Sequence, residues 1–127
     1  MNSANDLLKR RWLVVDDHAS VAMLISIVLR RLGMAEVDEC HSPLDAMVQT
    51  ERERFELIIT DRDMPGLDGL EFARRVRAQS PATRIIMVTA NPYELSPNVL
   101  RDAGISALVD KPFSIVALER IVLRVMG

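Results

Sequence analysis

The sequence predicts an α/β fold built on a doubly wound, parallel five-stranded sheet, and three observations support this prediction. Short apolar segments rich in β-branched residues recur along the chain, and most end abruptly at a polar or charged residue. They are apolar throughout rather than alternating, which is typical of strands that helices cover on both faces. Amphipathic segments with a helical period lie between them. Such regular βα alternation favours a doubly wound sheet with right-handed crossovers.

Four of the five predicted strands are strongly apolar. The fifth, over residues 35–40, alternates apolar and polar side chains and is therefore expected at an edge of the sheet. In chain order the other four cover residues 12–15, 55–60, 84–88 and 105–109.

The predicted helices are bounded by recognisable start and stop signals. Four of them follow a residue of N-cap type: Ser42, Asp68, Ser96 and Ser114. The first helix carries apolar residues at a helical spacing: Val21, Leu24, Ile25, Val28 and Leu32. Helices are expected over residues 21–32, 43–53, 69–78 and 115–126, with a short one from Pro97 that Gly104 closes.

Composition indicates one ordinary globular domain. The chain has 127 residues, 49% of them hydrophobic, so we expect a short N-terminal tail over residues 1–10 and one domain over residues 11–127. The net charge of −2 gives no long-range attraction to nucleic acid. Cys40 is the single cysteine, which fits a reducing compartment. The polar N-terminus lacks a signal-peptide core and no apolar stretch is long enough to span a bilayer, so we expect a cytoplasmic protein without membrane insertion.

Polar residues follow four of the predicted strands. Because the carboxyl ends of parallel strands face a common crevice where ligands bind, residues distant in sequence should gather there. The gathered residues are Asp16, Asp17, Asp61, Thr89 and Lys111.

These residue types suit phosphoryl transfer. Neighbouring carboxylates repel one another, and Mg²⁺ prefers such oxygen ligands and also binds phosphate oxygens. The carboxylate of Asp61 is a competent nucleophile for phosphorus. A lysine and a threonine hydroxyl would hold phosphoryl oxygens. Taken singly, each residue has a plainer interpretation as a helix cap, a turn residue or a surface charge; their joint occurrence at successive strand ends favours a site.

These motifs resemble the response-regulator receiver domain of two-component signalling. The resemblance covers residues 11–126 and rests on four segments: the acidic pair after the first strand, TDRDMPGLDG around Asp61, Thr89-Ala90, and Lys111-Pro112-Phe113. It implies a flavodoxin-like (βα)5 fold, similar to that of single-domain chemotaxis-type response regulators. It also implies that a sensor histidine kinase or a histidine phosphotransfer protein phosphorylates Asp61.

The resemblance assigns further roles to individual residues. Mg²⁺ would be bound directly by Asp17, Asp61 and the backbone carbonyl of Asp63, whereas Asp16 would act mainly through water. Thr89 and Lys111 would hold the phosphoryl oxygens. The chain would transfer and hydrolyse one phosphoryl group by self-catalysis, rather than turn over a substrate as an enzyme.

Two smaller roles also follow from the resemblance. The Lys111-Pro112 bond would be cis, and Ala90 would leave room for the phosphoryl donor.

The sequence departs from the family pattern at two positions. Leu108 stands where many relatives have an aromatic ring that rotates inward on activation, so we hypothesise that signalling depends on Thr89 and the loop after it. Asp63 stands where Asn or another residue is common. Its side chain should point outward, and its charge should alter the rates of phosphorylation or dephosphorylation.

The segment after Phe113 accommodates one helix, from Ser114 to Gly127, so we expect output by contact with a downstream protein. The apolar surface of this last helix is a candidate face for partners or a homodimer. Two alternatives remain open. One is a haloacid-dehalogenase-like phosphatase with Asp61 as nucleophile and Asp63 as general acid/base; the other is a receiver-like binding module that works without phosphorylation.

Overall fold

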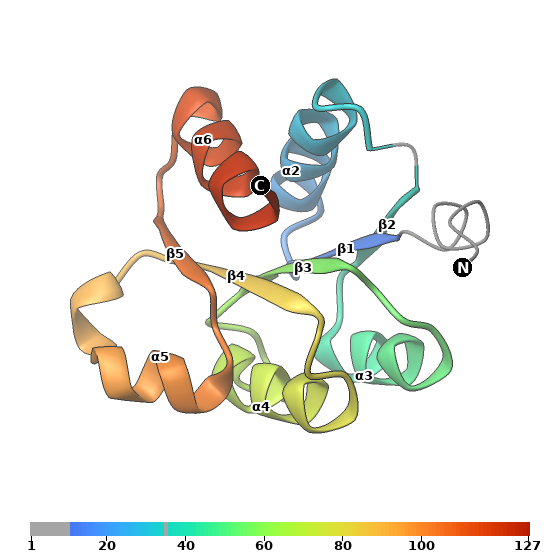
Figure 1. Ribbon diagram of the computed structural model, residues 1–127, viewed down its shortest axis with the longest axis vertical. Coiled ribbons are helices and arrows are strands. Elements are labelled where there is room, and N and C mark those ends of the chain that lie inside the picture. Colours follow the sequence, from blue (N-terminus) through green and yellow to red (C-terminus); the bar gives the residue numbers. More distant parts are fainter. Residues whose placement is uncertain (1–10, 35) are drawn as a thin grey trace.

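The computed structural model describes residues 11–34 and 36–127, and its centre is one parallel five-stranded sheet (Figure 1). The strand order is β2-β1-β3-β4-β5. The predicted doubly wound parallel sheet is therefore confirmed, with the weakly apolar strand at an edge. The tail predicted over residues 1–10 lies outside the described residues. The strands are β1 (Trp12–Val15), β2 (Val37–Cys40), β3 (Leu57–Asp61), β4 (Arg84–Thr89) and β5 (Ala107–Asp110).

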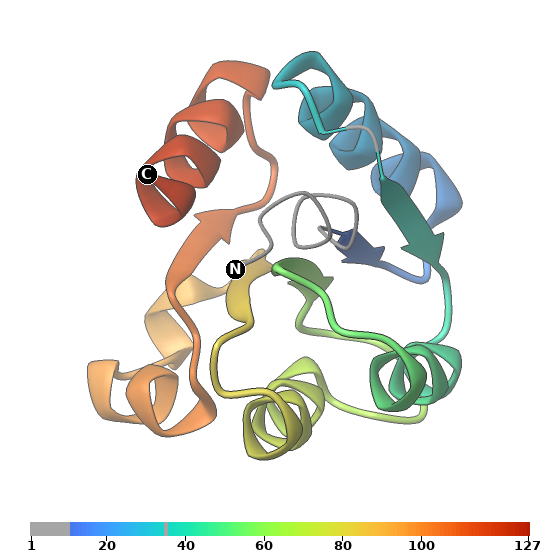
Figure 2. The same cartoon turned by 45° about the vertical axis from the view of Figure 1, so that its right-hand side comes forward.

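Helices cover both faces of the sheet, as Figures 1 and 2 show from two directions. One face carries α2 (Ala19–Arg31) and α6 (Ile115–Met126). The other carries α3 (Pro43–Arg52), α4 (Gly69–Gln79) and α5 (Pro97–Ala103), and a 3₁₀ turn, η1 (Pro92–Glu94), precedes α5. Within the described part of the chain, no helix combines the length and the apolar character needed to cross a membrane.

The sheet divides the apolar interior into two clusters. Val14 and Ile59 point to the cluster under α2 and α6, whereas Leu13 and Ile58 point to the cluster under α3, α4 and α5. All four are completely buried, and complete burial of one such side chain contributes about 1.5–3 kcal/mol. The central strands are therefore held from both sides, which fixes the positions of their carboxyl ends.

The N-cap predictions are confirmed by hydrogen bonds. The hydroxyls of Ser42, Ser96 and Ser114 each accept a bond from a backbone N–H three residues later, and Asp68 Oδ1 accepts one from the N–H of Leu70. Such caps satisfy N–H groups that the first helical turn leaves unpaired. Gly104 ends α5 in the left-handed conformation, with φ of 76°.

The apolar stripe predicted for the first helix was partly wrong. Leu24 is 38% exposed, and the buried side of α2 includes Ser26, whose hydroxyl donates to the carbonyl of Ala22. A serine that satisfies its hydroxyl within its own helix can occupy the core, so hydrophobic spacing alone misplaces the stripe. The helix also begins at Ala19, two residues before the predicted start.

Three strands, β2, β3 and β5, begin at a later residue than predicted. Phe55 is buried but precedes β3, and its carbonyl accepts a hydrogen bond from the Thr83 hydroxyl. The N–H of Ile105 donates to the carbonyl of Leu100 at the end of α5, so Ile105 belongs to the helix terminus and not to β5. Before β3 and before β5, an apolar residue packs in the interior without joining the sheet.

The last helix, α6, has a narrower buried side than its apolar residues indicate. Leu118 and Val122 are buried, whereas Ile115, Val116 and Leu123 are exposed. The predicted role of this apolar surface in partner binding or dimerisation stays a prediction.

Candidate functional site

The register of the parallel strands brings the predicted site residues to one edge of the sheet. Val15 of β1 lies opposite Thr60 of β3, and Asp61 lies opposite Val88 of β4. Asp16, which follows Val15, and Thr89, which follows Val88, therefore lie near Asp61 at the carboxyl edge of the sheet. Asp16 and Thr89 are completely buried there, and Asp61 is 4% exposed.

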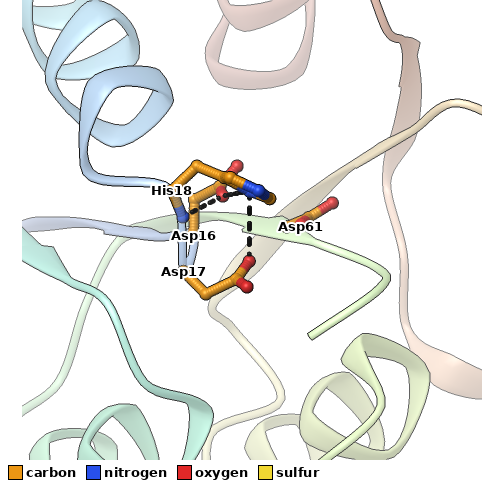
Figure 3. Close-up of side chains that lie close together, drawn as sticks. All are labelled: Asp16, Asp17, His18 and Asp61. Atoms are coloured by element: carbon orange, nitrogen blue, oxygen red, sulfur yellow. Dashed lines mark hydrogen bonds and ion pairs between the residues drawn. The ribbon is translucent and has the colours of Figure 1, made fainter. Parts of the chain in front are cut away.

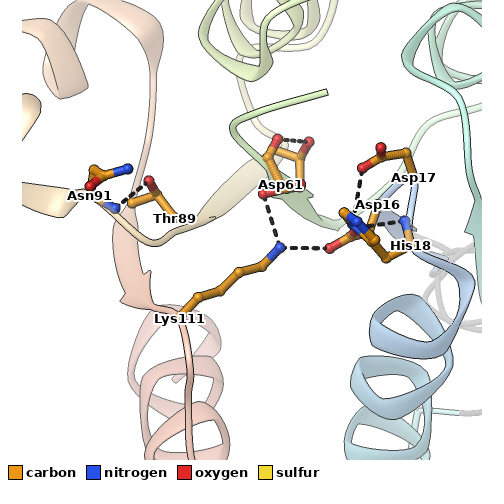
Figure 4. A network of polar contacts seen from close by, with 8 residues as sticks. Asp16, Asp17, His18, Asp61, Thr89, Asn91 and Lys111 are labelled. Carbon is orange, nitrogen blue, oxygen red and sulfur yellow. Dashed lines mark hydrogen bonds and ion pairs between the residues drawn. The ribbon is translucent and has the colours of Figure 1, made fainter. Parts of the chain in front are cut away.

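The Lys111 ammonium group lies between the two buried carboxylates (Figure 4). Its Nζ is 3.2 Å from Asp16 Oδ2 and 3.2 Å from Asp61 Oδ1. The Lys111 side chain is 22% exposed, so this contact is largely shielded from water. A single cation thus joins the ends of β1 and β3 from the segment after β5.

Burial and neighbouring charges have opposing effects on the pKa values of Asp61 and Lys111. Burial, and then the charge of Asp16, raise the pKa of Asp61, and the Lys111 ammonium offsets only part of this effect. Burial alone would lower the pKa of Lys111, but the charges of Asp16 and Asp61 outweigh it and the pKa of Lys111 is raised. Lys111 is therefore firmly cationic, and the region around Asp61 carries uncompensated negative charge.

Asp17 lies at the more open side of the same group (Figure 3). Its Oδ1 atom is buried without a hydrogen-bond partner among the described residues. His18 Nδ1 is 3.4 Å away, which is an ion-pair distance, but the two atoms do not form a hydrogen bond. An unpaired buried oxygen is costly unless something else satisfies it, and a divalent cation would do so. The carboxylates of Asp16, Asp17 and Asp61 therefore suit a Mg²⁺ ion.

His18 lies beside the acidic pair in the structure as it does in the sequence. It is 66% exposed, as expected for a loop residue, but its Nδ1 is 3.3 Å from Asp16 Oδ1. The backbone N–H of His18 donates to the same oxygen at 2.9 Å. Its position directly after the acidic pair was the only available signal.

The Thr89 side chain forms no hydrogen bond with the other predicted site residues among the described residues. Its hydroxyl accepts a hydrogen bond from the N–H of Asn91 at 3.0 Å, and no bond joins it to Asp61 or Lys111 in the structure. Lys111 is nevertheless adjacent, because its backbone N–H donates to the Thr89 carbonyl at 2.9 Å. The Thr89 hydroxyl thus orders the loop that leads into η1.

An ion pair links this loop to the chain after Asp61. Arg62 Nη1 lies 2.7 Å from Glu94 Oε1, and the Arg62 side chain is largely buried. The Arg62 backbone N–H also donates to the Val88 carbonyl at 3.0 Å. Arg62 thus connects Asp61, the candidate phosphoacceptor, to the loop after Thr89.

The loop between β3 and α4 closes tightly over the strand end. The Gly69 N–H donates to the Arg62 carbonyl at 2.8 Å, and a side chain at Gly69 would collide with the backbone of Asp61 and Arg62. Glycine is therefore required by close approach at this position. Asp63, in the same loop, is exposed, in agreement with the expected outward side chain. The metal-binding role of its carbonyl stays a prediction.

Three smaller predictions concern the neighbouring segments. The Lys111-Pro112 peptide bond is cis, as predicted. Ala90 is exposed beside the buried Thr89. Leu108 is half-buried and packs against the same apolar cluster as Leu95, which follows η1.

Comparisons with known proteins agree with this arrangement. The family model for the response regulator receiver domain matches residues 12–123. The transcriptional regulatory protein ResD of Bacillus subtilis is 37% identical over 102 residues, which are 80% of this chain and 42% of ResD. The chain therefore spans less than half the length of that relative.

Two solved structures are also similar. The chemotaxis protein CheY4 of Vibrio cholerae is 32% identical, with a TM-score of 0.79 and coverage of 91% of this chain and 98% of the other. The receiver domain of the sensor histidine kinase PA1611 of Pseudomonas aeruginosa is 32% identical, with a TM-score of 0.79 and coverage of 93% and 98%. That receiver domain holds a magnesium ion in its active site cleft.

Proposed function

Because the chain belongs to the response regulator receiver domain family of two-component signalling, we propose that Asp61 accepts a phosphoryl group from a histidine kinase or a histidine phosphotransfer protein. The observation that carries this proposal is the Lys111 ammonium group, 3.2 Å from each of two buried carboxylates on adjacent strands. A cation in this position is available to a phosphoryl oxygen as soon as Asp61 carries one. The ion pair of Lys111 with Asp61 would then become an ion pair with the phosphoryl group.

Asp61 is the carboxylate best suited to be the nucleophile. It ends β3, is flanked by the other polar strand ends, and faces Lys111 with one oxygen. In the transfer, a carboxylate oxygen of Asp61 forms a bond to phosphorus while the bond between phosphorus and the donor nitrogen breaks. Asp16 is an unsuitable alternative, because its two oxygens already interact with Lys111 and with the N–H of His18.

The neighbouring residues would stabilise the charge that builds up during transfer. Lys111 supplies a positive charge, and the Thr89 hydroxyl has a proton to donate to a phosphoryl oxygen while it accepts from Asn91. Asp17, Asp61 and the Asp63 carbonyl would hold Mg²⁺, with Asp16 acting through water. When bound, the ion would neutralise the carboxylates and stabilise negative charge on the phosphoryl oxygens. The magnesium ion in the PA1611 receiver domain supports this assignment.

The proposed chemistry is stoichiometric. Asp61 would be labelled once and the acyl phosphate would then be hydrolysed, without turnover of an external substrate. The family match argues against the haloacid-dehalogenase alternative, in which Asp63 would be a general acid/base. The exposed position of Asp63 also gives no support to that role.

Phosphorylation would be reported through the loop after Thr89. With Leu108 in place of an aromatic ring, a ring rotation is not available. The ion pair of Arg62 with Glu94 and the packing of Leu95 in the cluster of Leu108 connect this loop to β3 and β5. A shift of Thr89 toward a phosphoryl group would therefore change the position of the exposed η1 segment, which a downstream protein would recognise.

Incubation with acetyl phosphate and Mg²⁺, followed by intact mass measurement, tests the proposal. We expect one added phosphoryl group that is labile in base and requires Mg²⁺. Asp61→Ala should abolish it, whereas the matched variant Asp102→Ala, which removes an exposed aspartate of α5, should be labelled like the wild-type protein. The absence of labelling by acetyl phosphate and by candidate kinases would contradict the proposal and favour a binding module that works without phosphorylation.

A further inference from the structure

We propose that His18 is a nitrogen ligand of the metal site, so that this pocket binds a first-row transition ion such as Co²⁺ or Zn²⁺ through an imidazole together with the carboxylates that follow β1 and end β3. The inference deepens the proposed function and rests on it for the metal pocket. What it adds is the imidazole, which the acidic residues alone do not provide. The relevant group consists of Asp16, Asp17, His18 and Asp61 (Figure 3).

The spacing of the donor atoms suits a small divalent ion. His18 Nδ1 is 3.3 Å from Asp16 Oδ1 and 3.4 Å from Asp17 Oδ1, and one ligand atom from each of the four residues lies within 4.8 Å of every other. Two ligands of a tetrahedral ion at about 2.0–2.1 Å from the metal lie about 3.3 Å from each other. The distances from His18 Nδ1 to Asp16 Oδ1 and to Asp17 Oδ1 therefore match the spacing of two ligands on one ion.

The backbone of His18 is anchored beside Asp16. Asp16 Oδ1 accepts a hydrogen bond from the His18 N–H at 2.9 Å, which holds His18 at the N-cap of α2. Figure 4 shows the ring beside the carboxylates of Asp16 and Asp17. Because Lys111 contacts Oδ2 of Asp16, Oδ1 is the oxygen on the side of His18.

One atom of Asp17 lacks a hydrogen-bond donor among the described residues, although the side chain is 26% exposed. This atom, the buried Oδ1, faces His18 Nδ1. A carboxylate oxygen withdrawn from water without a donor is costly. A cation between Asp17 Oδ1 and His18 Nδ1 would satisfy both atoms at once.

The mixed donor set determines the class of ion. Mg²⁺ takes oxygen ligands and retains much of its water, so an imidazole adds little to its binding. Imidazole is a preferred ligand of Zn²⁺, Ni²⁺ and related ions. His18 should therefore increase the preference of this pocket for a transition ion over Mg²⁺.

The second histidine of the chain provides a matched control. His41 Nε2 lies 3.6 Å from Glu39 Oε1 and is half-exposed, so it also pairs with a carboxylate at the surface. It is not part of any group of three or more potential ligands in residues 11–34 and 36–127. The chain contains no third histidine.

Titration of the tag-free full chain with Co²⁺ and with Zn²⁺ tests the inference, using calorimetry and the visible absorption of bound Co²⁺. We expect His18→Gln to weaken Co²⁺ binding at least about tenfold, since even residues that only support a ligand change affinity by about 10–100-fold. The ratio of Co²⁺ to Mg²⁺ affinity should fall to a similar extent. His41→Gln should bind like the wild-type protein. Equal Co²⁺ affinity in the wild-type and His18→Gln proteins, or an equal loss in His41→Gln, would overturn the inference.

Two further measurements separate this inference from the proposed function. Paramagnetic shifts of the His18 ring protons on addition of Co²⁺ to the wild-type protein report ligation without any substitution, and unshifted ring signals at saturation would contradict it. Labelling of the wild-type protein by acetyl phosphate with Mg²⁺ tests Asp61 alone. If labelling succeeds and His18 makes no difference to Co²⁺, only the inference fails. If Co²⁺ binding depends on His18 and labelling fails, only the proposed function fails.

Discussion

In the middle of the sheet the buried side chains are apolar, whereas at its carboxyl edge they are two carboxylates and a threonine hydroxyl. Ile58 and Ile59 are as inaccessible to water as Asp16 and Thr89. Burial of the isoleucines stabilises the fold by removing apolar surface from water. Burial of the carboxylates opposes folding, because it disfavours charge and brings like charges together.

The contrast indicates that the edge is maintained for chemistry and the middle for stability. Lys111 offsets part of the repulsion but leaves the pKa of Asp61 raised. Such a balance is typical of functional sites, where stability and activity compete. Truncation of an apolar core residue should therefore lower stability, whereas neutralisation of the buried Asp61 carboxylate should raise it and abolish labelling. The following experiments are given in order of their expected effect on stability.

Phe72→Ala should cause the largest loss of stability. Phe72 of α4 is completely buried, and truncation of a buried phenylalanine costs about 3–5 kcal/mol. Urea unfolding followed by circular dichroism measures this loss. Val116→Ala, at an exposed apolar position of α6, is the matched control and should change stability by less than about 0.5 kcal/mol. A similar loss in both variants would contradict the assigned core.

Lys111→Met should cause an intermediate loss of about 1–3 kcal/mol at neutral pH, because it leaves the Asp16 and Asp61 carboxylates without their cation. The raised pKa of Lys111 means that its stabilising contribution is fully present below the ordinary value of 10.5 and is lost as the pH rises through the folded-state value. Urea unfolding of both proteins at several pH values measures the difference. We expect Asp61→Asn to restore part of the stability of Lys111→Met, and the absence of any restoration would argue against a shared charge cluster.

Asp61→Asn in the otherwise unchanged chain should increase stability slightly, by roughly 0.5–1 kcal/mol, while abolishing phosphorylation. The folded-state pKa of Asp61 lies above its ordinary value of 3.8, so ionisation of this carboxyl destabilises the folded protein as the pH rises between these two values. The gain should be complete above the folded-state pKa and vanish below 3.8. Unfolding of the metal-free proteins across this range measures it; a loss of stability at neutral pH would show that Lys111 outweighs the repulsion.

Asp63→Asn should leave stability almost unchanged but alter the rates of labelling and hydrolysis by about two- to fivefold, because it removes one charge from the entrance of the site. Asp63 is exposed, so its effect should also decrease at high salt. Stopped-flow labelling with acetyl phosphate at two salt concentrations measures both rates. Identical kinetics in the two proteins would exclude a role for this charge.

Sequence periodicity and strand-end chemistry were sufficient for the fold and for most of the site. The first strand and the last helix have the predicted bounds, and the parallel register brings Asp16, Asp61 and Lys111 together as expected. These features follow from local patterns and from the rule that parallel strands share a carboxyl edge.

The features that were missed depend on single side-chain contacts between distant or unusual positions. The ion pair of Arg62 with Glu94 joins residues 32 apart, and nothing in either segment indicates it. Ser26 occupies the core because its hydroxyl bonds within α2. The turn of His18 toward Asp16 depends on a backbone hydrogen bond that a residue pattern does not encode.

The chemical position of the phosphoryl group distinguishes Asp61 from every other candidate acceptor. Reduction of the labelled protein with borohydride converts a phosphorylated aspartate to homoserine, and peptide mass spectrometry identifies the position. We expect homoserine at position 61 alone, formed only with acetyl phosphate and Mg²⁺. Homoserine at position 16, 17 or 63, or phosphate attached to a residue other than aspartate, would contradict it.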